Sequence, residues 1–424
     1  TFLDLGNQPL ANNFSKKYTR PLFRLKLKFD TKSKLVMINK HMKKEKMFNK
    51  SYPYRSSKSK LVEKLFKELS KKIKKKFKPK NILEIGCNDG TFASNFNKKN
   101  ITCIEPCSDV AFEAKRKGLR VYDSYFDDLL VKKLIKNYSK FDIIFSANTI
   151  THISNLNAVF NNISKILADN GTLIIEEPSL LETIKQNSYD QFYNEHIYVF
   201  STIALQNILK KNNLEIYDVE NIKVHGGSNR YYIKKSKNKK IKISSRFKKN
   251  IYLEKKFGLH KFSCYSNFSK KVRTSKIKLI KLFKKLKSNN EKIIGYGASA
   301  KAVTIINYCN LKEKYFDYFY DTTKQKIGKF LPGTKIKVLK YQKLKNSQIC
   351  VFLGAWNFYR EILKKENFFY VNSGKFITHI PYPKIIKKLK KGNKILIDDG
   401  KYLFSVIGKK GNSIITKCRS QNCI

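Results

Sequence analysis

The feature that most constrains the fold is a strict alternation of strand-like and helix-like segments between residues 81 and 177. Short apolar runs alternate with longer segments whose apolar residues recur at helical spacing. This alternation is typical of βα units whose strands lie parallel in one sheet. We therefore predict an α/β, doubly wound, Rossmann-like domain. Its expected strands are 81–86, 101–105, 119–122, 141–147 and 172–177, with helices from 91 and over 110–117, 127–137 and 156–167.

Further segments on either side of this core set the domain organisation. A helix is expected over 59–77, and strand-like runs at 214–224 and 230–233 are expected to close the sheet as an antiparallel hairpin. A second α/β unit opens at residue 292 with a strand, a Gly-rich turn and a helix. We predict a small irregular N-terminal module (1–57), the Rossmann-like domain (58–234), a helical connector (235–290), a C-terminal α/β domain (291–383) and a β-rich tail (384–424).

Length and hydropathy bound the class of protein. The chain has 424 residues, 41% of them hydrophobic, which is enough for two or three domains with buried cores. No run of about 18 apolar residues and no charged-then-apolar leader occurs, so we expect a cytoplasmic enzyme without a membrane span. The first residue is Thr1, which indicates a reading frame that starts upstream. Eight cysteines without a C-x-x-C pair predict free thiols in a reducing compartment.

The formal net charge of +57 raises nucleic-acid binding as a function class. The excess is nearly all lysine and is spread along the whole chain, whereas a nucleic-acid site needs cations clustered on one face. We therefore favour a solvated lysine-rich surface over a nucleic-acid partner. The positive field still favours the approach of an anionic small-molecule substrate.

The run EIGCNDG (84–90) lies where the first predicted strand turns toward the next element. Glycines at such a turn let the backbone approach a ligand closely, and Glu105, at the end of the second strand, is placed to accept hydrogen bonds from ribose hydroxyls. The spacing is G-x-x-x-G with Asp89 inside the loop, not the G-x-G-x-x-G of dinucleotide sites. This favours S-adenosylmethionine over NAD, the alternative being a Gly-rich turn without a ligand.

A second constellation, Tyr193-Asn194-Glu195-His196, follows the fifth predicted strand. Methylation at carbon requires removal of a proton beside a ketone, and His196 is a candidate base, with Glu195 and Tyr193 orienting it or holding hydroxyls. The enolate oxygen needs a donor, such as a tyrosine hydroxyl. His152 follows the fourth strand on the same sheet edge and is either a second acid/base group or a packing residue.

The third constellation is Gly295-Tyr296-Gly297-Ala298-Ser299-Ala300-Lys301. Small residues before a helix can form an anion site at the helix N-terminus, and Lys301 adds positive charge, so a diphosphate could bind here. A Gly-rich turn with no ligand is an equal alternative.

Together these runs resemble the sugar C-methyltransferases, enzymes with an N-terminal zinc-binding module, a class I methyltransferase domain and a C-terminal α/β domain. The resemblance covers about nine tenths of the chain and keeps the family's order. The runs that carry it are LDLGNQPLAN (3–12), YRSSKS (54–59), 84–90, 104–106, Asn148 with His152, 193–196, 225–230, 295–301 and 324–333.

The resemblance implies S-adenosylmethionine as cofactor and a nucleotide-linked 4-keto-6-deoxy sugar as acceptor, methylated beside the ketone, usually at C3. It makes His196 the general base, with Tyr193, Glu195, His152 and Tyr54 around the sugar and the enolate. The expected cofactor-binding residues are Glu84, Gly86, Asn88, Asp89, Gly90, Glu105, Pro106 and Asn148. The expected substrate-binding residues are His225, Gly226, Gly227, Ser228, Arg230, Gly297, Ser299, Lys301 and Lys324.

One departure concerns the family's zinc module. Its second cysteine pair falls at Asp30 and Ser33 in this chain, and its first pair falls before Thr1. Structural zinc sites take thiolate or imidazole ligands, so we expect no zinc and a module held by packing alone or partly decayed. Two other functions remain as alternatives: an RNA or other small-molecule methyltransferase, and a non-catalytic sugar-nucleotide-binding relative.

Overall fold

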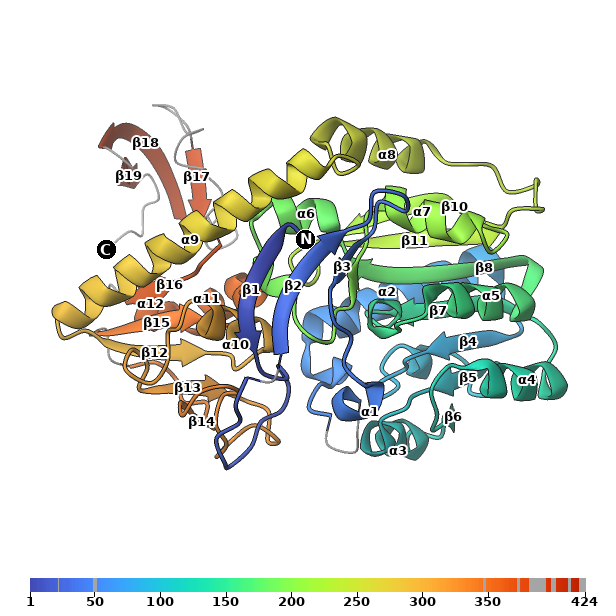
Figure 1. Cartoon of the computed structure of the whole chain (residues 1–424), viewed down its shortest axis with the longest axis horizontal. Helices are drawn as coiled ribbons and strands as arrows, with labels where there is room; N and C mark the ends of the chain where they lie inside the picture. The colour runs from blue at the N-terminus through green and yellow to red at the C-terminus, as the bar shows by residue number, and fades with distance from the viewer. Residues whose placement is uncertain are drawn as a thin grey trace. The chain divides into compact units, whose positions relative to one another are not determined.

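The computed structural model describes residues 1–21, 23–48, 52–345, 348–371, 374–380, 394–397, 402–410 and 413–418. The chain divides into two compact units, Thr1–His379 and Ile380–Ile424. The first unit contains three of the sheets seen in Figure 1. Each unit is described below by itself.

The largest sheet has seven strands in the order β10-β11-β8-β7-β4-β5-β6. The five strands from β8 to β6 are parallel, whereas β11 runs antiparallel to β8 and pairs antiparallel with β10. The doubly wound α/β prediction and its closing hairpin are therefore confirmed. The strands are β4 (Ile82–Ile85), β5 (Ile101–Ile104), β6 (Arg120–Tyr122), β7 (Phe141–Ala147), β8 (Leu167–Pro178), β10 (Leu214–Ile222) and β11 (Ser228–Lys235).

Several helices of this sheet begin at a residue whose side chain caps the first turn. The Ser59 hydroxyl accepts a hydrogen bond from the Val62 N–H (3.3 Å) and so starts α2 (Lys60–Phe77), whose apolar face is buried through Phe66 and its neighbours. Asp127 likewise caps the helix that begins at Asp128, because its carboxylate accepts a hydrogen bond from the Leu130 N–H (3.0 Å). The remaining helices of this part are α3 (Ser108–Arg116), α4 (Asp128–Asn137), α5 (Leu156–Ile166), α6 (Leu180–Lys185) and α7 (Thr202–Lys210).

The helix predicted from residue 91 is wrong. Only a 3₁₀ turn, Ala93–Asn95, forms there. The Ser94 hydroxyl donates to the Gly90 carbonyl (2.8 Å) and the Asn95 amide donates to the Thr91 carbonyl (3.0 Å). Such side chains compete with main-chain donors for helix carbonyls, which explains the short turn.

A second, fully parallel sheet has the order β14-β13-β12-β15-β16. It begins at the predicted strand near residue 292, and two helices fill the segment expected to be a helical connector. Its strands are β12 (Lys292–Tyr296), β13 (Tyr318–Asp321), β14 (Lys337–Lys340), β15 (Ile349–Leu353) and β16 (Lys375–Ile377), and its helices are α9 (Phe262–Ser288), α10 (Ala300–Tyr308), α11 (Tyr359–Lys365) and α12 (Asn367–Val371). The helix α8 (Ser245–Phe257) packs against α7 and β10 of the seven-stranded sheet.

The N-terminal segment is more regular than expected. β1 (Leu3–Gln8), β2 (Phe23–Phe29) and β3 (Val36–Ile38) form an antiparallel sheet, which β9 (Tyr198–Val199) extends; a short helix, α1 (Lys44–Met47), follows. The alternation of buried residues along β2 was the period-2 signal for this sheet. Because β9 directly follows the 193–196 run, this sheet is tied to the predicted acid/base cluster.

Asp30 and Ser33, where the resemblance places a cysteine pair, bind each other. The Asp30 carboxylate accepts hydrogen bonds from the Ser33 N–H (2.7 Å) and from the Ser33 hydroxyl, closing the turn between β2 and β3. Among the described residues, no group of three or more His, Cys, Asp or Glu side chains could hold a metal ion. The donors present do not fit a structural zinc ion.

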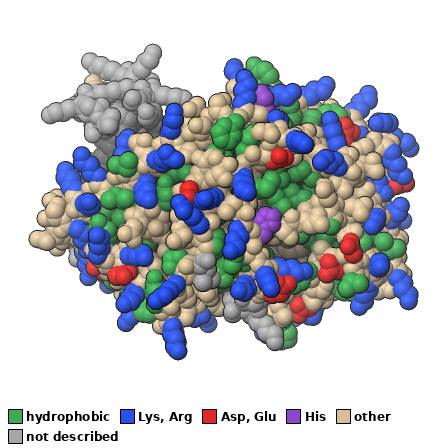
Figure 2. Space-filling view, in the orientation of Figure 1, with side chains coloured by type: hydrophobic (Ala, Val, Ile, Leu, Met, Phe, Trp, Pro, Cys, Tyr) green, Lys and Arg blue, Asp and Glu red, His purple; other side chains and the backbone are tan. Residues whose placement is uncertain are grey.

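The second unit contains an antiparallel sheet of β17 (Lys394–Ile397), β18 (Tyr402–Lys410) and β19 (Ser413–Cys418). The predicted β-rich tail includes this sheet, and residues 381–393 lie outside the described part. In the described ranges, no helix is both long and apolar enough to cross a bilayer. On the face drawn in Figure 2, Lys and Arg side chains are scattered over the surface.

Candidate active site

A cavity of about 990 Å³ opens at the carboxyl ends of β4, β5 and β7. This is the edge where open α/β sheets bind ligands. The cavity extends to the first turn of α10 in the C-terminal half. The predicted residues that line it are Tyr54, Glu84, Gly86, Asn88, Glu105, Pro106, Asn148, His152, Tyr193, His196, His225, Gly297, Ser299 and Lys301.

The first βα turn is shaped by backbone conformation. Gly86 has a φ of +75°, and a Cβ there would lie 2.2 Å from the Thr149 hydroxyl. Asn88 also has a positive φ, and its N–H donates to Glu105 (2.9 Å), which accepts a second hydrogen bond from the Cys107 N–H (3.0 Å). Burial raises the pKa of Glu105 despite these donors. The turn thus fixes Glu105 in the cavity wall, and its carboxylate oxygens can still accept hydrogen bonds from a ligand.

Among the residues around the first βα turn, Glu84 has the side chain best placed to bind a ligand. It is buried and lines the cavity, and its Oε2 atom has no hydrogen-bond partner in the described structure. Burial raises the pKa of Glu84 well above its usual value. Unpaired buried carboxylate oxygens are costly, so this atom fits a ligand donor such as an ammonium or hydroxyl group.

Asp89 and Gly90 do not line the cavity as the structure describes it. Asp89 accepts hydrogen bonds from the Thr91 hydroxyl (2.6 Å) and the Ser57 N–H (3.2 Å), so its carboxylate serves the loop. Gly90 packs so closely that a Cβ would lie 2.4 Å from Leu119. Asp89 and Gly90 therefore stabilise the turn without lining the cavity.

His196 has a defined tautomer. Its Nδ1 lies 2.8 Å from the Gln191 carbonyl oxygen and its Nε2 lies 2.7 Å from the Tyr193 hydroxyl. A carbonyl only accepts, so Nδ1 carries the hydrogen and Nε2 accepts from Tyr193 when the ring is neutral. Burial, with the nearby His152 and Lys301, lowers the pKa of His196 well below its usual value, so the ring is neutral. Its Nε2 lone pair therefore faces the Tyr193 hydroxyl at the cavity wall.

His152 and Glu195 support this pair from different sides. The His152 Nδ1–H donates to the Glu195 carbonyl (2.6 Å), and burial lowers the pKa of His152 to about 4. The Glu195 side chain lies behind the wall, where it accepts from the Asn12 amide (2.8 Å) and the Tyr52 hydroxyl (3.3 Å). Burial raises the pKa of Glu195 to about 7. Glu195 thus links the N-terminal module to the acid/base cluster.

Sequence reasoning missed Tyr52, Asn12 and Lys326, all of which line the cavity. Tyr52 stands two positions before the predicted Tyr54, in Tyr52-Pro53-Tyr54, and the aromatic pair was the available signal. The Lys326 Nζ donates to the Ala298 carbonyl (2.8 Å), whereas the predicted Lys324 does not line the cavity in the described structure.

The turn before α10 is closed by its own side chains. The Ser299 hydroxyl accepts from the Ala302 N–H (3.1 Å) and donates to the Gly354 carbonyl (2.6 Å), so it caps the helix. The Lys301 Nζ donates to the His225 carbonyl (3.2 Å), and burial lowers the pKa of Lys301 to about 8. Lys301 is a buried cation at the cavity wall, and it is the main feature there that suits an anion.

Most of the predicted 225–230 loop turns away from the cavity. Gly226 and Gly227 have positive φ, and a Cβ at Gly226 would lie 2.6 Å from the Trp356 ring. The Ser228 hydroxyl donates to the Val224 carbonyl (3.1 Å). Within the described structure only His225 of the predicted loop residues reaches the cavity lining.

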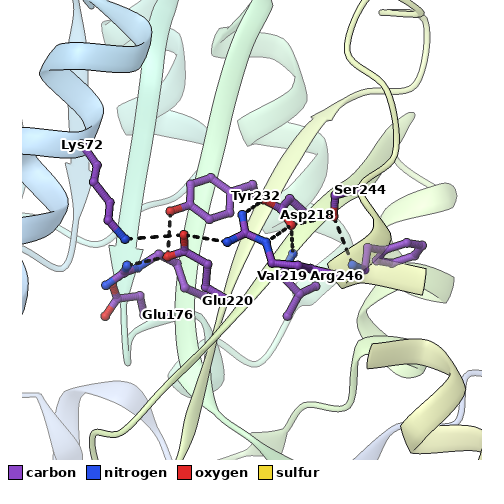
Figure 3. A network of polar contacts seen from close by, with 10 residues as sticks. Lys72, Glu176, Asp218, Val219, Glu220, Tyr232, Ser244 and Arg246 are labelled. Carbon is purple, nitrogen blue, oxygen red and sulfur yellow. Dashed lines mark hydrogen bonds and ion pairs between the residues drawn. The ribbon is translucent and has the colours of Figure 1, made fainter. Parts of the chain in front are cut away.

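Arg230 takes part in a buried ion-pair network, whose members Lys72, Glu176, Glu220 and Arg246 are labelled in Figure 3. Its Nε lies 2.6 Å from Glu176 and its Nη1 lies 2.9 Å from Glu220. Glu220 also pairs with Lys72 (3.6 Å) and Arg246 (3.3 Å). The Arg230 guanidinium therefore joins β8, β10 and β11 and does not face the cavity, whose wall Glu176 forms.

Glu177 gives a pH-dependence prediction. Burial raises the pKa of Glu177 to about 8, although its carboxylate accepts from the Thr151 N–H (3.2 Å). The folded state then holds a proton that the unfolded chain has released, so this contribution to stability is present below the unfolded pKa and is lost as pH rises through about 8. We expect Glu177→Gln to flatten the fall in Tm between about pH 5 and about pH 8. Thermal melts would check this, with exposed Glu63→Gln as control; parallel curves for wild type and Glu177→Gln would contradict it.

Two family models match the chain. A methyltransferase domain matches residues 54–219, and a C-methyltransferase C-terminal domain matches residues 223–381. The C-methyltransferase NovU of Streptomyces niveus is 25% identical over 308 residues, covering 72% of this chain and 73% of NovU.

Solved methyltransferases resemble part of the chain. A SAM-dependent methyltransferase of Thermotoga maritima is 19% identical and covers 42% of this chain and 92% of its own, with a TM-score of 0.34. The N-methyltransferase NodS of Bradyrhizobium japonicum is 16% identical, with 41% and 94% covered and a TM-score of 0.32. The two matched domains and the Rossmann-like sheet lead to one assignment: the chain is a class I S-adenosylmethionine-dependent methyltransferase that carries a C-methyltransferase C-terminal domain.

Proposed function

We propose that the chain methylates the carbon beside the ketone, C3, of a nucleotide-linked 4-keto-6-deoxy sugar. The observation that carries the proposal is the neutral His196, fixed between the Gln191 carbonyl and the Tyr193 hydroxyl at the cavity wall. A carbon acid needs an unprotonated base, whereas a lone-pair nucleophile such as an amine needs none. The C-methyltransferase C-terminal domain and the resemblance to NovU support the same reaction class.

The residues at the first βα turn fit S-adenosylmethionine. The unpaired Glu84 oxygen suits the ammonium of its amino-acid part, and Glu105 suits the ribose hydroxyls. Asn88, Pro106 and Asn148 complete this wall, with Gly86 allowing close approach of the backbone. The cofactor, when bound, supplies an electrophilic methyl group on a sulfonium.

His196 takes the proton from the substrate carbon at Nε2. For this the Tyr193 hydroxyl leaves Nε2 and donates to the ketone oxygen, where negative charge develops in the enolate. The Gln191 carbonyl keeps Nδ1–H in place and stabilises the imidazolium that forms. His152 and Tyr54 form the adjacent wall around the sugar.

The C-terminal half supplies the cationic side of the cavity. Lys301 and Lys326 both line it, and their charges suit the diphosphate of a nucleotide sugar. Ser299 and Gly297 shape this wall by capping and by close packing on Ala355. This arrangement favours a substrate with an anionic and a ketone-bearing end.

Replacing Glu105 by Gln tests the cofactor assignment. Glu105 presents a charged acceptor between two fixed N–H donors, and charged hydrogen bonds contribute about 1.5–3 kcal/mol. We therefore expect S-adenosylmethionine to bind about 10- to 100-fold more weakly to Glu105→Gln. Isothermal titration calorimetry checks this, with exposed Glu63→Gln as the matched control. Equal affinities for all three proteins would contradict the assignment.

Proton exchange tests the reaction. The protein is incubated in heavy water with a thymidine-diphospho-4-keto-6-deoxyglucose, with and without S-adenosylmethionine, and the C3 proton is followed by NMR. Exchange without cofactor and a new C-methyl signal with it are expected. Methyl transfer to RNA, or to oxygen or nitrogen of a small molecule, without C3 exchange would overturn the proposal.

A further inference from the structure

We propose that Asp190 is a positioning residue through which the C-terminal half of the chain sets the orientation of His196. The inference rests on the proposed function for its catalytic consequence, but its structural claim concerns residues of this chain alone. Asp190 lies six positions before His196 and does not line the cavity in the described structure. The proposal follows from what holds Asp190 and from what Asp190 holds in turn.

Asp190 is held by one side chain that is distant in sequence and lies close to a second. It is fully buried, and its carboxylate accepts a hydrogen bond from the Trp356 indole N–H (2.5 Å). The His379 Nε2 lies 3.1 Å from its other oxygen, at ion-pair distance but without the geometry of a hydrogen bond. Trp356 follows β15 and His379 follows β16, so both residues lie just after strands of the five-stranded sheet.

The neighbours of Asp190 transmit its position to His196. The carbonyl of the next residue, Gln191, receives the His196 Nδ1–H (2.8 Å). The Gln191 amide donates to the His225 carbonyl (2.5 Å), so both ends of this residue are held. On the other side, the buried Tyr189 ring packs against His379 with centroids 5.1 Å apart. A shift of the backbone at Asp190 would therefore displace the Gln191 carbonyl, which fixes the His196 ring.

Charge gives Asp190 a second effect on the same ring. Burial opposes ionisation of Asp190, but His379, Lys301 and the Trp356 N–H together keep its pKa below the usual value. The carboxylate is thus ionised beside the Lys301 cation. Removing it would leave the buried Lys301 charge without its counter-charge near His196. The position of Asp190 thus favours a correctly oriented base, and its charge balances that of Lys301, the cation that helps to lower the pKa of His196.

The test uses the full chain and two variants. Asp190→Asn keeps the size and an oxygen acceptor but removes the charge, and Trp356→Phe keeps a ring but removes the donor. Exposed Asp317→Asn is the matched control. The chain has only six histidines, so ¹⁵N-histidine NMR resolves their ring nitrogens, and the spectrum of His196→Gln identifies the His196 signals.

We expect wild type and Asp317→Asn to show His196 as the Nδ1–H tautomer, and both test variants to show a changed tautomer mixture or pKa at His196. On the keto-sugar, kcat should fall about 10- to 100-fold in Asp190→Asn, with the Kd for S-adenosylmethionine unchanged. Unchanged His196 signals in both folded variants would overturn the proposal. If wild type methylates no keto-sugar, the proposed function fails, but the NMR comparison still decides the role of Asp190.

Discussion

Replacement of His196 by glutamine is expected to lower methyl transfer by about 10²- to 10⁴-fold, the range for loss of a general base. Glutamine keeps a donor for the Gln191 carbonyl but offers no basic lone pair to the substrate carbon. The same variant should lose C3 proton exchange in heavy water. Binding of S-adenosylmethionine should stay unchanged, because Glu84 and Glu105 belong to another part of the cavity wall. Initial rates and calorimetry measure both quantities.

His260→Gln provides the control for the His196 variant. His260 does not line the cavity as described, so its replacement should leave kcat and cofactor binding at wild-type values. Retention of more than about a tenth of the activity by His196→Gln would remove His196 as the base, since the expected loss is at least about 100-fold. His152, whose ring centroid lies 5.3 Å from that of His196, would then be the next residue to replace.

The parallel sheet could be predicted because its determinants are local. Strands such as β4 and β5 are short apolar runs, and several helix starts carry a capping side chain, such as Ser59 or Asp127. The N-terminal sheet was missed although β2 alternates, and its extension by β9 could not be predicted because β9 comes from residues far along the chain. Pairing between Val36 and Val199 leaves no periodic signal in either segment. The short turn at 93–95 was missed because side-chain competition for carbonyls does not alter the apolar spacing.

The site shows the same division between local and distant information. Residues that directly follow parallel strands, such as Glu105 and Asn148, were predictable because strand ends converge at one edge of the sheet. The residues that support the acid/base cluster were not predictable from the sequence. Asn12 and Trp356 come from opposite ends of the chain and bind Glu195 and Asp190, respectively. Arg230 was predicted to bind substrate, but the charge that it meets is that of Glu176 on a neighbouring strand. Sequence order therefore predicted residues of the cavity wall better than the residues that support them.

Arg230→Ala is expected to lower the free energy of unfolding by about 3–5 kcal/mol. Arg230 and Glu176 side chains are each only 4% exposed, and removal of the guanidinium leaves Glu176 as an uncompensated buried carboxylate, whereas Glu220 keeps Lys72 and Arg246. Urea unfolding followed by circular dichroism measures the loss. Arg24→Ala is the control, because the Arg24–Asp4 pair is 64% and 30% exposed and such pairs contribute about 0–1 kcal/mol.

A double variant separates the cost of an unpaired charge from the loss of packing. In Arg230→Met with Glu176→Gln, the buried pair is replaced by neutral groups of similar volume, and such replacements are often neutral or stabilising. We therefore expect the double variant to be more stable than Arg230→Ala, with Glu220 still paired to Lys72 and Arg246. A loss below about 1 kcal/mol for Arg230→Ala would show that the pair behaves like an exposed one. An equal loss in the single and double variants would instead assign the effect to packing between β8 and β11. Either result bears on the cavity, because Glu176 forms part of its wall and depends on Arg230 for its charge balance.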